Sequence, residues 1–175
     1  MFDFFGKKKK QIQHFSHDKA EYQWESAVET YCEINETDQA DIDFDNLDEK
    51  TENILWEYAG NHIAYFMVWL IRHDFFVAED LEEEIKLVKS EKMSGVSFLM
   101  DCCDGTFARD MVKDEVVGFV DSYYESPGTY LGDYCDFIEG ELKGEVFGTR
   151  FLWEEYHQFE GTIDKAYREY CASTS

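Results

Sequence analysis

WEYAGNHIAYFMVWLIRHD, residues 56–74, is the stretch that decides the fold. Its apolar side chains recur at the three- and four-residue spacing of a helix and form one continuous face. That face consists of Trp56, Ala59, Ile63, Phe66, Met67 and Leu70. Most of the opposite side is also apolar, and a helix that is apolar nearly all round must be buried. Its uncharged run is about half of the roughly 18 residues that a membrane span needs. We therefore predict the central core helix of a soluble domain.

Length and composition indicate one globular domain. A chain of 175 residues falls within the usual size of a single domain. With 44% hydrophobic and 17% aromatic residues, it can build a large core. The five cysteines are an odd set without a CxxC pair, which favours reduced thiols over disulfides or a zinc site. The N-terminus lacks the order of a secretory signal, so we expect a cytoplasmic protein.

The net charge of −23 restricts the class of partner. A strongly negative field repels phosphates and anionic lipids, so we expect no direct binding to nucleic acid. The same field attracts cations and proteins with basic surfaces. The alternative is that the acidity only keeps the protein soluble.

Helical spacing recurs along most of the chain and predicts a mainly α bundle of about six or seven helices. Turn signals at Asp104-Gly105 and at 126–128 separate several of them. Three glycines leave room for a short strand pair near residues 140–153. We find no interdomain linker and predict a single acidic helical domain over residues 20–175. The helices are expected near 20–34, 56–74, 78–92, 94–103 (from a Ser94 cap), 111–125, 130–138 and 162–171.

Residues 1–19 are predicted to form a flexible basic tail. Three phenylalanines precede the Lys7–Lys10 run, a combination that favours weak contact with an anionic membrane. The segment is short and the rest of the chain is strongly negative, so we favour a solvated tail without stable membrane insertion.

Three acidic clusters are candidate partner-binding surfaces. The first is a stripe of glutamates four residues apart, where like charges disfavour a helix by a few tenths of a kcal/mol per pair. The second lies in residues 35–52, which carry eight carboxylates and one lysine. The third lies within the helix expected near residues 78–92. The candidate residues are Glu21, Glu25, Glu29, Glu33, Asp41, Asp43, Asp45, Asp48, Glu49, Glu82, Glu83 and Glu84.

A calcium loop is the alternative interpretation of the second cluster. Asp41, Asp43, Asp45, Glu49 and Glu52 fall at positions 1, 3, 5, 9 and 12 of the calcium-loop template. Asn46 stands where the template requires glycine. A linker or acidic binding loop between two helices fits this segment better.

The sequence contains no specific catalytic motif. It has no GxSxG elbow, HExxH pair, glycine-rich phosphate loop or paired zinc motif. His62 is interpreted as a hydrogen-bonded core histidine. We therefore predict a protein that is not an enzyme and that needs no metal or cofactor.

The segment from Asn61 to Trp69 resembles the His-Ile-Gly/Ala-Met/Tyr-Phe/Tyr-x-x-Trp core of a family of small bacterial proteins. The blocks 120–124 and 130–134, and the aromatic segment 153–170, resemble that family as well. The resemblance implies an immunity or accessory protein encoded near toxin and secretion-system genes, and it implies no catalytic residue. The sequence thus predicts an immunity protein that binds a basic, nuclease-type toxin domain. The alternative is a calcium- or metal-responsive module that uses residues 41–52.

Overall fold

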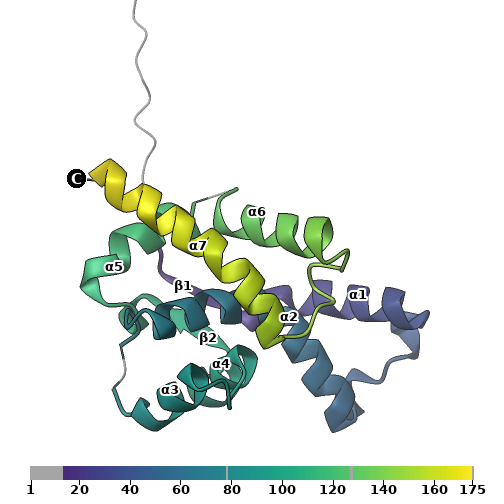
Figure 1. Ribbon diagram of the computed structural model, residues 1–175. Helices are drawn as coiled ribbons and strands as arrows, with labels where there is room; N and C mark the ends of the chain where they lie inside the picture. The colour runs from purple at the N-terminus through teal and green to yellow at the C-terminus, as the bar shows by residue number, and fades with distance from the viewer. Residues whose placement is uncertain (1–13, 78, 127, 175) are drawn as a thin grey trace, which may run out of the picture.

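The computed structural model describes residues 14–77, 79–126 and 128–174. The predicted mainly α bundle is confirmed: the described residues form seven α-helices and one two-stranded sheet (Figure 1). The helices are α1 (Trp24–Asn35), α2 (Glu49–Arg72), α3 (Glu82–Lys89), α4 (Gly95–Cys103), α5 (Asp114–Phe119), α6 (Tyr130–Cys135) and α7 (Trp153–Thr174). Wider π-helical turns continue α5 through Val120–Tyr124 and α6 through Asp136–Glu141. Among the described residues, no helix is both long and apolar enough to cross a lipid bilayer.

Helix α2 is the predicted central helix, and it crosses the middle of the molecule (Figure 1). It begins at Glu49, earlier than Trp56, because the Asp48 side chain caps it by accepting a hydrogen bond from the Thr51 N–H at 3.0 Å. Every residue from Tyr58 to Ile71 is buried. A helix covered on all sides needs neighbours on all sides, which α1, α4 and α7 supply.

Three buried polar side chains of α2, Asn61, His62 and Trp69, contact polar groups on distant elements. The Trp69 indole N–H donates to Asp164 of α7 at 2.8 Å, and the Asn61 amide donates to the Tyr134 hydroxyl of α6 at 3.0 Å. His62 is buried, and its Nε2 lies 3.5 Å from a carboxylate oxygen of Asp18. Buried polar groups are costly unless they are hydrogen-bonded, so these contacts fix how the helices pack around α2.

Helix α4 approaches α2 closely because its first residue is glycine. A Cβ added at Gly95 would lie 2.6 Å from Val68 Cγ2 and 3.1 Å from the Ala64 carbonyl oxygen.

We expect Gly95→Ala to lower the free energy of unfolding by about 1–3 kcal/mol through overpacking, measured by urea denaturation. The matched control is Gly132→Ala in α6, where nothing lies within 4 Å of the added atom. The Gly132→Ala variant should have a free energy of unfolding about 0.5–1 kcal/mol higher than the parent protein. Equal effects at the two sites would contradict the close approach.

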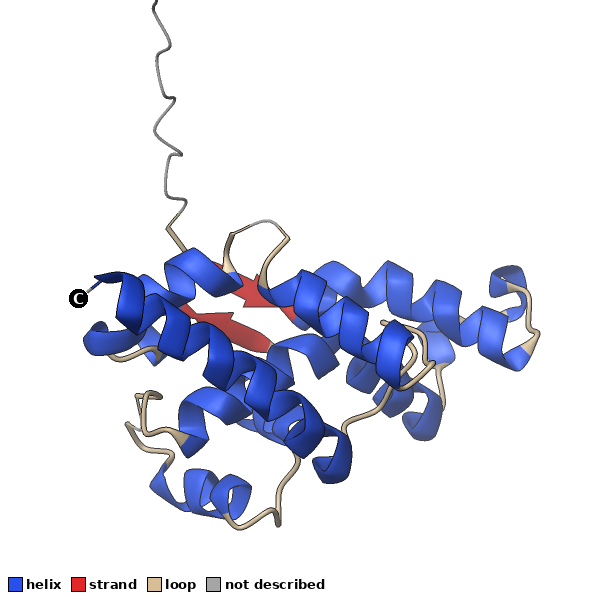
Figure 2. Cartoon of the chain, turned by 45° about the horizontal axis from the view of Figure 1, so that its top comes forward, coloured by secondary structure: helices blue, strands red, loops and turns tan. Residues whose placement is uncertain are grey.

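The two strands lie far from the predicted position. Strand β1 (His17–Lys19) pairs antiparallel with β2 (Thr106–Ala108), with Asp18 opposite Phe107 (Figure 2). Residues 140–153, where we expected the strand pair, form turns and irregular chain together with the ends of two helices. Strands of three residues carry no usable alternation in the sequence, so their position depends on tertiary contacts.

The predicted tail of residues 1–19 is also corrected in part, since residues 14–19 belong to the folded domain. Phe15 is 1% exposed and packs against Phe107 and Tyr124. The buried carboxylate of Asp121 accepts hydrogen bonds from the Phe15 N–H at 2.7 Å and from both terminal nitrogens of Arg109. The predicted membrane contact concerns residues 1–13, which lie outside the described residues.

Asp121 makes the packing of residues 14–19 against the rest of the domain sensitive to acid. Burial by itself raises the pKa of its carboxyl, but hydrogen bonds from Arg109, Phe15 and His14 outweigh burial and hold that pKa below its usual value. A carboxyl whose pKa is lower in the folded state stabilises the fold above its unfolded pKa. That contribution is lost as the pH falls through the folded pKa.

We expect Asp121→Asn to lower the free energy of unfolding at neutral pH by about 1–3 kcal/mol, because Arg109 loses its charged acceptor. The variant should also lose less stability than the parent protein between about pH 5 and about pH 3. Urea denaturation across that range measures both effects, with the exposed Asp136→Asn as control. If the stability of the variant and that of the parent protein change with pH in the same way, Asp121 does not hold residues 14–19 through its charge.

Candidate functional site

An acidic arm projects from the bundle on the right of Figure 1. We define the acidic arm as α1, residues 36–48 and the first turn of α2. The apolar stripe of α1 buries Ala27, Val28 and Cys32, and the Trp24 ring lies 4.3 Å from the Trp56 ring of α2. Because this stripe faces α2, the glutamates Glu25, Glu29 and Glu33 are left on the exposed side.

The carboxylates of the acidic arm are not neutralised. Residues 25–52 contain one lysine, Lys50, and eleven carboxylates. Among the described residues, none of these eleven groups lies within 4.0 Å of a cationic side chain. Such a surface repels itself, and this repulsion is relieved when a cationic surface approaches. The eleven are Glu25, Glu29, Glu33, Glu36, Asp38, Asp41, Asp43, Asp45, Asp48, Glu49 and Glu52.

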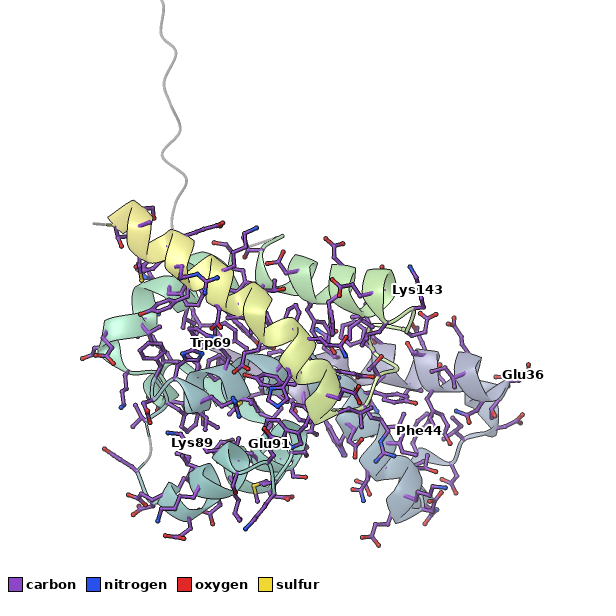
Figure 3. The ribbon with its side chains drawn as sticks, in the orientation of Figure 1. Glu36, Phe44, Trp69, Lys89, Glu91 and Lys143 are labelled. Atoms are coloured by element: carbon purple, nitrogen blue, oxygen red, sulfur yellow. The ribbon has the colours of Figure 1, made fainter. Side chains whose placement is uncertain are left out.

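The structure brings together only part of the predicted acidic set. The glutamates of α1 and the carboxylates of residues 41–49 share the acidic arm, which carries Glu36 and Phe44 in Figure 3. The cluster Glu82, Glu83 and Glu84 belongs to α3, on the other side of the molecule near Lys89 (Figure 3). Lys86 partly neutralises that cluster through Glu83 at 2.5 Å, and Lys19 lies 3.4 Å from Glu21.

Several of these carboxylates have a local structural role. Asp43 accepts hydrogen bonds from the Asp45 N–H at 3.2 Å and from the Asn46 amide at 2.9 Å. Hydrogen bonds from Thr51 hold the pKa of Asp48 below its usual value. Within the described part of the chain, no three His, Cys, Asp or Glu side chains are grouped so as to hold a metal ion. The calcium-loop alternative therefore stays a prediction that no contact in this segment favours.

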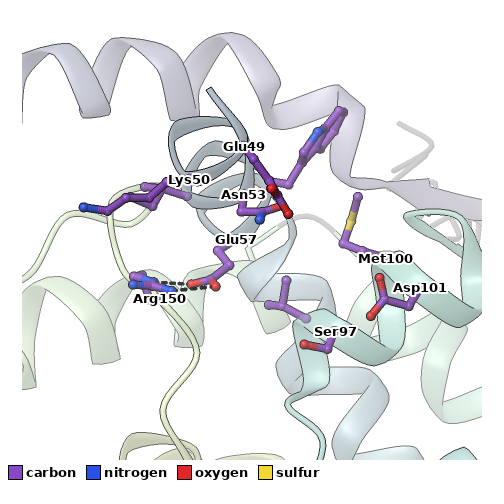
Figure 4. A pocket seen from close by; sticks show the side chains of 11 residues that line it. Glu49, Lys50, Asn53, Glu57, Ser97, Met100, Asp101 and Arg150 are labelled. Atoms are coloured by element: carbon purple, nitrogen blue, oxygen red, sulfur yellow. Dashed lines mark hydrogen bonds and ion pairs between the residues drawn. The ribbon is translucent and has the colours of Figure 1, made fainter. Parts of the chain in front are cut away.

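The sequence analysis missed a groove between α2 and α4, which begins at Glu49 of the acidic arm. It encloses a cavity of about 740 Å³. Glu49 and Asn53 of α2 face Ser97 and Asp101 of α4 across it, and the ion pair between Glu57 and Arg150 closes one side (Figure 4). Its apolar lining consists of Ile54, Trp56, Val96 and Met100.

The groove continues into a smaller cavity. This second cavity of about 220 Å³ shares Trp56 and Met100 with the first, and its lining includes Glu21 and Asp104. The only sequence signal was polar residues at helical spacing on two separate helices, Glu49 with Asn53 and Ser97 with Asp101. That signal does not reveal that the two faces meet. Arg150 is 93 residues from its partner Glu57, so its position was not predictable.

Comparison with known proteins gives one match. A family model described as a domain of unknown function, DUF7832, matches residues 36–170. No curated protein matches the chain, and no solved structure does. The matched range includes the whole α2–α4 groove and residues 36–52 of the acidic arm, whereas α1 precedes it. Because the match covers most of the 175 residues, this chain belongs to the DUF7832 family.

Proposed function

We propose that this protein is an immunity protein that binds and neutralises a cognate bacterial toxin domain with a basic surface. The observation that carries the proposal is the acidic arm, whose eleven carboxylates have no cationic partner within 4.0 Å among the described residues. The resemblance of residues 61–69 to immunity and accessory proteins supports it as well. We further propose that the protein acts in the cytoplasm, where its five cysteines would stay reduced.

Apolar side chains within the acidic arm favour a protein partner over a small cation. Ile34 is 49% exposed and Phe44 is 40% exposed, and both lie among the carboxylates. Protein interfaces commonly combine apolar or aromatic anchors with a polar rim. A metal ion would gain nothing from these side chains, whereas a protein surface would bury them.

Neutralisation follows from charge complementarity. A nuclease-type toxin needs a basic cleft to hold its phosphate-bearing substrate. The acidic arm would cover that cleft, exclude the substrate and accelerate encounter, because opposite fields raise association rates well above those of neutral surfaces. The protein would thus act by binding, without catalysis of its own.

The test begins with capture of the partner by the full-length protein in its native cell, followed by purification of that partner. We expect the partner to be a toxin whose activity is abolished in the complex. We also expect its association rate to fall by about tenfold or more between about 0.05 and about 0.5 M salt. A salt-independent association rate, or a toxin that stays active in the complex, would overturn the proposal.

A further inference from the structure

The α2–α4 groove combines unpaired negative charge with an apolar floor. Glu57 is neutralised by Arg150, but Glu49 and Asp101 have no cationic partner within 4.0 Å among the described residues. Lys50 also lines the groove, but its amine extends away from Glu49 and Asp101 (Figure 4). The groove therefore presents two carboxylates without a cationic partner, one from each helix, in the same lining as Trp56 and Met100.

We propose that this groove is the specificity pocket of the binding surface, and that it holds an arginine or lysine side chain of the partner next to an apolar residue. The inference rests on the proposed function and deepens it, since it names the chemistry that the groove selects. The long-range field of the acidic arm attracts any basic protein. A pocket of defined shape discriminates among basic proteins, because only a suitably placed side chain can fill it.

Lysine and arginine match both parts of the groove. Their methylene stems bury well against apolar surface while the charged head stays with polar groups. The stem would pack on Ile54, Trp56 and Met100, and the head would reach Glu49 and Asp101. The Trp56 ring offers a cation–π contact, which is strongest for tryptophan. Met100 adds a flexible side chain that adapts to the occupant.

An anionic occupant is disfavoured at the same place. Bringing a carboxylate or phosphate between Glu49 and Asp101 would set like charges close together in a partly enclosed cavity. Of the two cationic side chains in the lining, Arg150 already holds Glu57 through two of its nitrogens, and Lys50 extends away from the two carboxylates. The charge of the groove therefore selects a cation.

The experiment titrates the full-length protein at low salt with a peptide probe, acetyl-Gly-Arg-Leu-Arg-Gly-amide. The matched probe carries citrulline, which is neutral and of similar shape, in place of arginine. NMR signals of the Trp56 indole N–H and the Met100 methyl group report occupancy of the groove. We expect both signals to shift and saturate with the arginine peptide and to stay in place with the citrulline peptide.

Three variants separate the groove from the general field. The double variant Glu49→Gln with Asp101→Asn should weaken the binding of the arginine peptide at least about fivefold. Asp136→Asn with Glu139→Gln removes the same charge at exposed positions outside both the groove and the acidic arm, and it should weaken binding of the arginine peptide less than about twofold. Ser97→Phe fills the cavity from an exposed position of α4 without changing the charge, and it should abolish the shifts.

Equal weakening by the two double variants, or shifts that persist in Ser97→Phe, would overturn the inference, because binding would then reflect net charge alone. The same variants are measured against the captured toxin. If the toxin binds all of them equally but remains sensitive to the acidic arm, the groove inference fails and the proposed function stands. If no toxin is bound by the parent protein, the proposed function fails instead.

Discussion

Replacing Glu25, Glu29 and Glu33 together by glutamine should slow association with the basic toxin by at least about tenfold at low salt. These glutamates lie on the exposed side of α1, with no cationic partner within 4.0 Å among the described residues. The same change should raise the stability of the protein by a few tenths of a kcal/mol, because like charges four residues apart disfavour a helix. Weaker binding with a more stable fold is a signature that misfolding cannot produce.

The measurement pairs stopped-flow association with urea denaturation of each variant. The matched control replaces Glu82, Glu83 and Glu84 of α3 by glutamine, which removes the same charge from the other side of the molecule. We expect the control, measured in the same low-salt buffer, to slow association less than about threefold, since these charges lie on the other side of the molecule and act on the toxin only at long range. If the α3 variant slows association as much as the α1 variant, the acidic arm is not the docking surface.

Trp69→Ala should lower the free energy of unfolding by about 3–5 kcal/mol, the largest stability effect that we expect from one substitution. The Trp69 side chain is 0% exposed and packs against the rings of Phe66, Phe119 and Tyr167. Its loss opens a cavity in the core beside the C-terminal end of α2 and leaves Asp164 without its indole donor. Both effects add to the transfer free energy of the lost ring.

Urea denaturation followed by circular dichroism measures this loss. Leu152→Ala serves as control, because Leu152 is 54% exposed and its truncation should change stability by less than about 0.5 kcal/mol. The loss of free energy of unfolding for Trp69→Phe should lie between those of Trp69→Ala and Leu152→Ala, because phenylalanine keeps an aromatic ring but loses the hydrogen bond. A cost below about 1 kcal/mol for Trp69→Ala would show that the core reorganises around the gap.

The local sequence pattern was sufficient to predict the position of a helix wherever that helix has a capping residue at its start and a long run of apolar residues at helical spacing. The Ser94 cap of α4 is confirmed by its hydrogen bond from the Ser97 N–H at 3.0 Å. The start of α1 was less accurate, since that helix begins at Trp24 and not near residue 20. The start of α7 was also misplaced, since it begins at Trp153 and not near residue 162. Helix ends depend on caps and neighbours as much as on period.

The sequence by itself determined a mainly α bundle around a buried central helix, because apolar residues on all sides of residues 56–71 leave no other stable arrangement in water. It also determined the strongly acidic character, since charge is a property of composition. Only the tertiary structure decided where that charge gathers, which two short strands pair and which helix faces form the groove. Contacts such as Phe15 with Asp121, or Glu57 with Arg150, join residues 106 and 93 positions apart. No local period encodes such pairs, because they are selected by the packing of the whole core.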